Sequence, residues 1–159
     1  MRLRVSLPAQ TLEVLDDAGA VLAVYPVSTA ANGAGEERGS FCTPRGRHLI
    51  RAKIGAGLPL NSVFRARRFT GEIYTPELGA THPGRDWILT RLLWLSGREP
   101  GYNRLGSCDS MARYIYIHGT PDEAFEQAPR SHGCIRMRNG DLIELFERVP
   151  VYTPVEIIA

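Results

Sequence analysis

The chain has 159 residues, the length of one ordinary domain, and a hydrophobic content of 43%, which excludes both a disordered polymer and a bundle of membrane spans. Its net charge of +2 gives no electrostatic reason to expect binding to nucleic acid or to a membrane surface. We therefore expect a single domain over residues 1–159, with no nucleic-acid and no membrane partner.

The N-terminus, MRLRVSLPAQ, has a basic start but no apolar run, so we expect neither a secretory signal nor a membrane span. This favours a cytoplasmic protein, or a periplasmic one if a leader was removed. The three cysteines, Cys42, Cys108 and Cys134, cannot all pair with one another. An odd count predicts at least one free thiol and suits a reducing compartment.

The first fifty residues are predicted to form β-strands. Leu3 and Val5 alternate with polar neighbours, which is the pattern of a half-buried strand. Residues 11–27 contain two apolar runs around a turn that ends in Gly19, which predicts a hairpin. A further strand is expected in CTPRGRHLI, residues 42–50.

Residues 52–86 have scattered glycine and proline and no clear period. We expect a long irregular connection there, of the kind that often forms a lid or binding loop. The run RARR, residues 65–68, predicts a solvated surface, or a surface that attracts acidic peptides if it lies on the lid.

Two more strands are expected in WILTRLLWLSG, residues 87–97, and RYIYIHGT, residues 113–120. In the second strand Ile115 and Ile117 face one way, and His118 faces the other. His118 is therefore predicted to end a strand on the side opposite the core.

RNGDLIELFERVP, residues 138–150, is the one helix that the sequence predicts clearly. Asn139 or Asp141 is expected to cap it, and Glu144 to complete a capping box. A last strand follows in VEIIA, residues 155–159. These elements together predict a mainly β domain with few helices, in which two sheets pack together.

The stretch SHGCIRM, residues 131–137, leaves three interpretations of Cys134 open. A free cysteine is most often a small buried hydrophobic side chain. His118, His132 and Cys134 are acceptable zinc ligands, but the chain has no Cys-x-x-Cys or His-x-x-x-His spacing. In an extended segment Cys134 shares a face with Arg136, which is unusual for a core cysteine.

The third interpretation is a nucleophile. Thiol attack requires the thiolate, so a base or cation must lie close to Cys134, and His118 can be that base. A third group would then hold the imidazole. Gly133 lets a carbonyl approach the backbone, and the N–H groups near Gly133 and Cys134 could stabilise an oxyanion. Arg136 would supply charge for a substrate carboxylate.

IHGT, residues 117–120, followed by SHGCIRM resembles the signature of the YkuD-type L,D-transpeptidase family. YPVSTA, residues 25–30, and TPRGRHLI, residues 43–50, resemble its N-terminal strands, and residues 138–158 resemble its closing helix and strand. The resemblance covers most of the chain and is weakest over residues 55–86. It implies the family's β-sandwich, or flattened barrel, with a lid over the cysteine.

The resemblance also implies a role for each motif residue. Cys134 would be the nucleophile, and His118 would be the general base and later the acid. The Gly119 carbonyl would orient His118. Two further residues are implied to shape the site and its oxyanion hole, namely His132 and Gly133. Three are expected on the substrate side, namely Arg136, Ser131 and Tyr116.

The implied reaction is acyl transfer at the L,D bond between diaminopimelate and the terminal D-alanine of a murein tetrapeptide stem, with no metal or organic cofactor. Because no leader is visible, we favour an L,D-carboxypeptidase of peptidoglycan recycling. The alternative is an L,D-transpeptidase that forms 3–3 cross-links in the cell wall. A murein-peptide-binding module with an inactive site is the remote alternative. Carbapenem-type inhibitors are expected to acylate Cys134.

Overall fold

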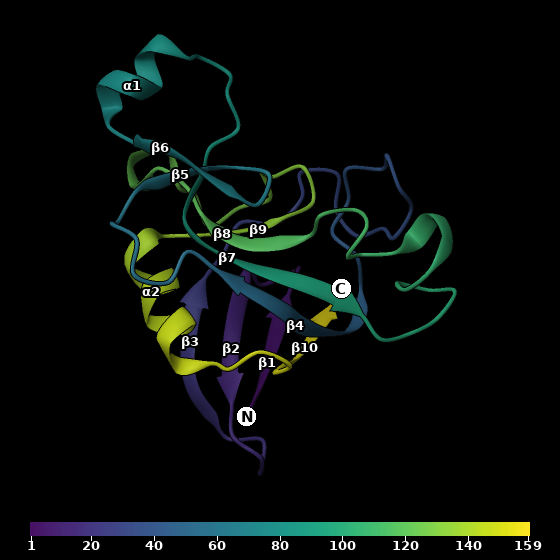
Figure 1. The fold of residues 1–159 in the computed structure, drawn as a ribbon. Coiled ribbons are helices and arrows are strands. Elements are labelled where there is room, and N and C mark those ends of the chain that lie inside the picture. Colours follow the sequence, from purple (N-terminus) through teal and green to yellow (C-terminus); the bar gives the residue numbers. More distant parts are fainter.

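The computed structural model describes all 159 residues and is mainly β, as predicted (Figure 1). The strands are β1 (Arg2–Ser6), β2 (Thr11–Leu15), β3 (Val21–Pro26), β4 (Gly46–Ile54), β5 (Ser62–Arg65), β6 (Arg68–Ile73), β7 (Ile88–Gly97), β8 (Tyr116–Gly119), β9 (Ile135–Met137) and β10 (Pro154–Ile158). The helices are α1 (Pro76–Thr81) and α2 (Asn139–Arg148), with 3₁₀ turns η1 (Gly106–Cys108) and η2 (Asp122–Ala124). No helix is long and apolar enough to cross a membrane.

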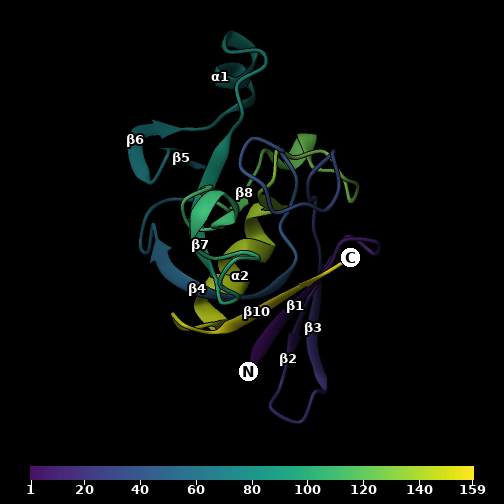
Figure 2. The ribbon, with the colours of Figure 1, turned by 90° about the vertical axis from the view of Figure 1, so that its right-hand side faces the viewer.

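The ten strands belong to one continuous mixed sheet, where we had expected two sheets packed together in a β-sandwich or flattened barrel. Eight of them follow the order β3-β2-β1-β10-β4-β7-β5-β6, and β8 pairs with β7 and β9. The sheet is continuous because β4 pairs with β10 on one side and β7 on the other, which joins the N-terminal strands to the central ones. Figure 2 shows β1 to β3 at one end of the molecule, and β5, β6 and α1 at the other.

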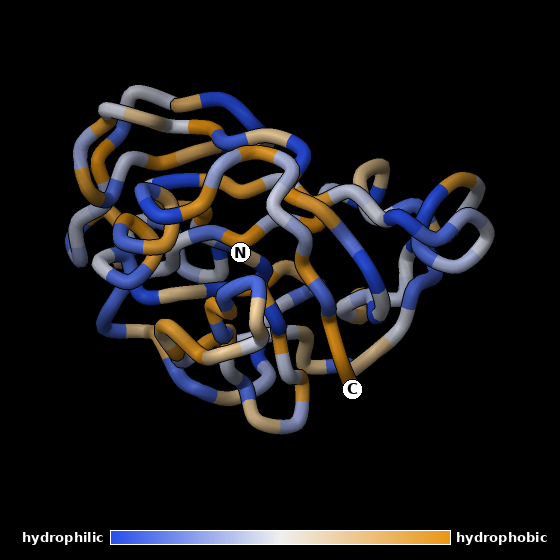
Figure 3. The backbone as a smooth tube through the Cα atoms, turned by 90° about the horizontal axis from the view of Figure 1, so that it is seen from below, coloured by the Kyte–Doolittle hydropathy of each residue, from blue (hydrophilic) through white to orange (hydrophobic).

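The main core lies where the N-terminal strands, the central strands and α2 meet. It takes Leu3 and Val5 from β1, Leu93 and Leu95 from β7, and Leu142 from α2, all fully buried. The tube in Figure 3 alternates between hydrophobic and hydrophilic colours along the chain. Alternation of this kind buries one face of a strand and leaves the other available, which is how this core supports a site on β8 and β9.

The expectation of an irregular connection over residues 52–86 is wrong. The segment contains the end of β4, the β5–β6 hairpin and α1. Val63 pairs with Leu89 of β7 and is buried, but β6 is almost wholly exposed. β5 buries three consecutive residues and β6 buries none, so neither strand has an alternating pattern, and pairing with β7 decides the structure.

The cap of α2 also differs from the prediction. Arg138 occupies the N-cap position without a side-chain cap, and Asn139 is the first helical residue. The Asn139 N–H instead donates to Asp122 Oδ1 at 3.1 Å, so a carboxylate distant in sequence satisfies the helix start. Glu144 accepts a hydrogen bond from the Tyr25 hydroxyl at 2.8 Å and forms no capping box.

Stability is expected to fall in acid because of His48, which is buried in β4. Burial lowers the pKa of His48 to about 4, from an ordinary value of 6.5. The unfolded chain therefore binds a proton below pH 6.5 that the folded chain binds only near pH 4, and stability is lost between these values. Urea unfolding measured from pH 7 to pH 4 should show this loss. In His48→Asn the free energy of unfolding should fall less steeply with decreasing pH. If the free energy of unfolding fell just as steeply with pH in His48→Asn, His48 would not be the cause of the loss in acid.

Candidate active site

The site is built on the parallel pairing of β8 with β9. Ile117 lies opposite Ile135, and His118 lies opposite Arg136. Ile117 and Ile135 point into the main core and are fully buried. Since side chains alternate along a strand, Cys134, which directly precedes β9, lies on the same face as His118 and Arg136. The pairing thus brings the two halves of the sequence motif together.

The Cys134 thiol lies in a largely apolar setting. Its Sγ donates to the Tyr114 carbonyl oxygen at 3.4 Å and accepts from the Tyr116 N–H at 3.4 Å. It packs against a small cluster that contains Phe64, Leu92 and Tyr116. Burial raises the pKa of the thiol to about 11, although the Tyr116 amide acts in the opposite direction. At neutral pH the sulfur is therefore protonated at rest.

The His118 side chain is buried and held from one side. Its Nδ1 lies 2.7 Å from the Gly119 carbonyl oxygen. A carbonyl can only accept, so Nδ1 carries the proton and Nε2 is left as an acceptor. Burial lowers the pKa of His118 below 6.5, and the Gly119 carbonyl only partly offsets this. The imidazole is therefore neutral at neutral pH and able to take a proton.

Gly119 must be glycine for its carbonyl to reach His118. A Cβ atom at this position would lie 2.2 Å from Asn139 Oδ1 and 2.6 Å from the Leu89 carbonyl oxygen. The Asn139 amide also donates to the Thr120 carbonyl oxygen at 2.9 Å, so the start of α2 holds the backbone that follows His118. The helix predicted from the sequence thus supports the candidate base, although we had assigned Asn139 only a capping role.

The turn before Cys134 is closed by its own hydrogen bonds. The Ser131 hydroxyl donates to the Cys134 carbonyl and accepts from the Gly133 N–H at 3.2 Å. Gly133 has a φ of +129°, which favours glycine, and a Cβ there would lie 3.1 Å from the Cys42 carbonyl oxygen. Thr43 donates to the Gly133 carbonyl oxygen at 3.0 Å. These contacts fix the peptide unit whose other end is the Cys134 N–H.

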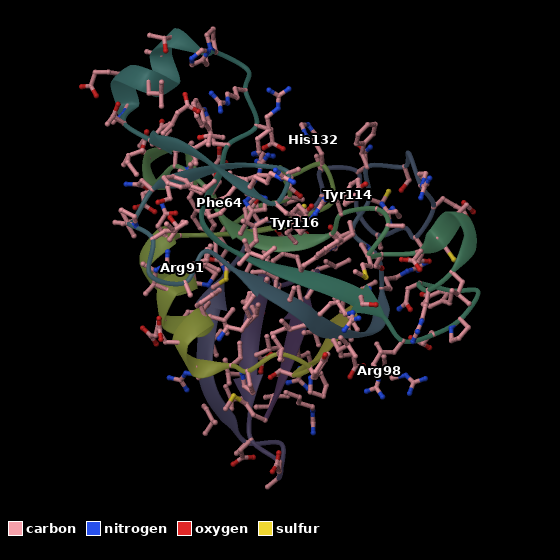
Figure 4. All side chains as sticks on the ribbon, viewed as in Figure 1. Phe64, Arg91, Arg98, Tyr114, Tyr116 and His132 are labelled. Carbon is pink, nitrogen blue, oxygen red and sulfur yellow. The ribbon has the colours of Figure 1, made fainter.

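The remaining motif side chains lie around the thiol on its exposed side. His132 is exposed, and its Nδ1 lies 3.8 Å from Asp86 Oδ2. Arg136 forms an ion pair of 2.9 Å with Asp86 Oδ1. Tyr116 is 3% exposed and its hydroxyl accepts from Arg67 at 3.2 Å. Figure 4 labels His132, Tyr114 and Tyr116, which lie to the right of the β5–β6 hairpin in this view.

Sequence reasoning missed three residues that contact the site. These are Thr43, Asp86 and Arg113, whose guanidinium donates to the Cys42 carbonyl oxygen at 2.8 Å. Thr43 stands in the Thr-Pro turn that we had assigned only to a strand start. No feature of the sequence points to Asp86 as a site residue, because Asp86 ends the segment where the resemblance to the family is weakest.

Two cavities are lined by residues that contact the motif, although neither lining includes Cys134 or His118. One has a volume of about 340 Å³, and its lining includes Phe41, Arg113, Tyr114 and His132. The other has a volume of about 650 Å³, and its lining includes Asp86 together with residues of the β5–β6 hairpin. No group of three histidine, cysteine or acidic side chains could hold a metal ion. The arrangement offers a protonated thiol and a neutral imidazole, with one cavity reaching His132 and another reaching Asp86.

The fold and this site define a mainly β domain with a histidine and a cysteine on adjacent parallel strands. The family model described as YkuD, L,D-transpeptidase catalytic domain, matches residues 1–157, so the chain belongs to this family. It is also 46% identical over 48 residues to "Probable L,D-transpeptidase YbiS" of Escherichia coli K12. That match covers 30% of the chain and 16% of the relative.

Solved structures have the same fold at low sequence identity. Bdellovibrio bacteriovorus Bd1075 is 17% identical with a TM-score of 0.60, over 99% of this chain and 47% of that one. L,D-transpeptidase 3 from Mycobacterium tuberculosis is 18% identical with a TM-score of 0.58, over 99% and 60%. The LD transpeptidase LdtMt1, solved in complex with imipenem, is 20% identical with a TM-score of 0.57, over 98% and 57%. The chain thus spans about half the length of these relatives.

Alkylation of Cys134 by iodoacetamide should be slow at neutral pH and accelerate steadily towards pH 11. The reason is that only the thiolate reacts, and burial keeps the thiol pKa at about 11. Peptide mass mapping over a pH series would give the rate for this cysteine, with Cys134→Ala as the control for adducts on Cys42 and Cys108. A rate that is already maximal at pH 7 would show a stable thiolate and contradict this description.

Replacing Thr43 by valine should lower the free energy of unfolding by about 1–3 kcal/mol. Valine keeps the shape but leaves the Gly133 carbonyl and the Ala30 N–H, which donates to Thr43 Oγ1 at 3.0 Å, without partners. Thr43→Ser keeps the hydroxyl and is the matched control. Equal urea midpoints and slopes for the two variants would show that the hydroxyl does not hold this turn.

Proposed function

We propose that this protein is a cysteine acyl-transfer enzyme that acts on the L,D bond between diaminopimelate and the terminal D-alanine of murein tetrapeptide stems. The observation that carries the proposal is the placement of Cys134 and His118 on one face of the β8–β9 pair. The Gly119 carbonyl, 2.7 Å from His118 Nδ1, takes the place of the acidic member of a catalytic triad. Membership of the L,D-transpeptidase family supports the same reaction.

The first half of the reaction forms a thioester. Cys134 Sγ attacks the carbonyl carbon of the L,D bond as its proton passes to His118 Nε2, and the carbonyl oxygen becomes an oxyanion. The Cys134 N–H stabilises that oxyanion, in a turn that Thr43 fixes through the Gly133 carbonyl and Ser131 fixes through the Gly133 N–H. The carbon–nitrogen bond then breaks, His118 returns the proton to the departing amine, and D-alanine leaves.

The resting protonation states fit this sequence. Burial raises the pKa of the thiol and lowers the pKa of the imidazole, so both groups are neutral before the substrate binds. Proton transfer therefore accompanies attack and does not precede it. Below pH 6.5 the rate should fall only as His118 becomes protonated, at a pH lower than for an ordinary histidine.

The second half of the reaction depends on the acceptor. Water, deprotonated by His118, would release a tripeptide stem, which is the L,D-carboxypeptidase reaction that we favour from the sequence. An amine of a second stem would give a 3–3 cross-link. The name of the curated relative favours this second candidate. The cytoplasmic or periplasmic location stays a prediction, and fractionation of cells that express the protein tests it.

Incubation with a purified tetrapeptide stem, read by mass spectrometry, tests the function and the acceptor together. We expect loss of D-alanine and a transient adduct on Cys134, with tripeptide as the main product. A cross-linked dimer without tripeptide would establish the transpeptidase. Cys134→Ala should abolish both products, and His118→Gln should reduce turnover by at least 100-fold. Full turnover by Cys134→Ala would falsify the nucleophile assignment.

A carbapenem offers an independent test of the same thiol. LdtMt1 has been solved in complex with imipenem, and we expect imipenem to acylate Cys134 of this chain. Intact mass should rise by one adduct in the wild type and stay unchanged in Cys134→Ala. An adduct that persists in Cys134→Ala would place the reactive thiol elsewhere, at Cys42 or Cys108.

A further inference from the structure

Of the arginines in the run RARR, only Arg67 makes side-chain contacts with the site. Its Nη1 donates to the Tyr116 hydroxyl at 3.2 Å. The side chains of Arg65 and Arg68 form no hydrogen bond or ion pair and are exposed. The turn between β5 and β6 positions Arg67 for this contact, with Ala66 at a φ of +54°. One cation of the run is therefore bonded to a site residue and two are exposed, of which Arg65 lines the cavity of about 650 Å³ whose lining also includes Asp86.

Aromatic rings hold the Arg67 guanidinium in place. Its central carbon lies 4.9 Å from the centre of the Trp94 ring and 4.9 Å from the centre of the Tyr114 ring. Stacking of this kind leaves the N–H edge of a guanidinium free for a bidentate partner. The group is therefore fixed before any ligand arrives, which lowers the entropic cost of binding one.

The residues that hold Arg67 are the ones that contact the thiol. Tyr114 accepts from Cys134 Sγ through its carbonyl oxygen, and Tyr116 donates to the same sulfur through its N–H. Trp94 packs on the same small cluster as Cys134. The guanidinium thus shares its immediate supports with the candidate nucleophile, although 67 residues separate them in the sequence.

Arg67 has no carboxylate partner, unlike Arg136 of the sequence motif. Arg136 is paired with Asp86 at 2.9 Å, and none of the ion pairs of the chain includes Arg67. Arg113 also lacks one, but it donates to three backbone carbonyls and the Ser40 hydroxyl. A cavity of about 350 Å³ is lined by Arg67, Trp94 and Tyr114, and also by Asp109, whose carboxylate accepts from the Leu105 and Ala112 N–H groups.

We propose that Arg67 binds a carboxylate of the substrate next to the scissile bond and so selects peptides with a free carboxyl group there. This inference rests on the proposed function, and it assigns to Arg67 the part that the sequence had given to Arg136. A tetrapeptide stem offers two such groups, the D-alanine terminus and the free carboxylate of diaminopimelate. Either forms charge-assisted, bidentate hydrogen bonds with a guanidinium.

The test compares Arg67→Gln with Arg68→Gln, which removes an equal charge from the same turn. With the free acid stem, Arg67→Gln should raise KM by roughly 10- to 100-fold, and Arg68→Gln by less than about twofold. Amidation of the carboxyl group that Arg67 binds should raise the KM of the wild type by a similar factor and leave the KM of Arg67→Gln unchanged. Stems amidated at D-alanine or at diaminopimelate identify which group binds. Equal KM values for acid and amides in the wild type would overturn the inference.

Binding separates this inference from the reaction. Calorimetry on Cys134→Ala, with and without Arg67→Gln, measures affinity for the acid stem in the absence of turnover. A loss of affinity that depends on Arg67 supports the carboxylate site even if no product forms in the wild type. If the wild type turns over the stem but Arg67→Gln does not change the affinity, the proposed acyl-transfer function stands and the carboxylate site at Arg67 is wrong. Iodoacetamide alkylation of Cys134 at an unchanged rate in Arg67→Gln shows that the pocket is still folded.

Discussion

The parallel pairing of β8 with β9 is the constraint on which the rest of the site depends. Parallel strands require a long connection, and residues 120–134 supply it. The pairing is anchored by Ile117 and Ile135, which are fully buried in the main core. Once these two side chains are fixed, the alternation of the strands puts His118 and Cys134 on the other face. The chemistry is therefore positioned by hydrophobic burial on the reverse side of the same backbone.

Burial also sets the protonation states of the pair. In an apolar setting neither a thiolate nor an imidazolium is stable alone, so both groups are neutral in the free protein at neutral pH. A backbone carbonyl, unlike a carboxylate, orients His118 without adding a full negative charge that would disfavour the thiolate. This choice of partner is possible because Gly119 has no side chain and lies directly against Asn139.

Features that depend on local pattern could be predicted from the sequence, and features that depend on distant contacts could not. The β2–β3 hairpin, β7, α2 and the faces of β8 follow from period and turn residues. The β5–β6 hairpin was missed because its pairing with β7 and not its own pattern determines it. The same holds for Asp86, which meets Arg136 across 50 residues of sequence. Arg136 was correctly placed beside Cys134, but no local signal indicated that a carboxylate already pairs with it.

The Asp86–Arg136 pair changes how the charges of the site should be understood. A cation next to the thiol would stabilise the thiolate, but here Asp86 neutralises Arg136, and its own charge raises the pKa of Cys134. Arg113 lowers the pKa of the thiol, yet its donors are used to hold the loop that carries Cys42. Among Arg136, Arg113 and Arg67, Arg67 is thus the one with free donors and no acid partner. Positive charge at the candidate nucleophile is therefore arranged for a ligand that brings its own carboxylate, more than for ionising the thiol in advance.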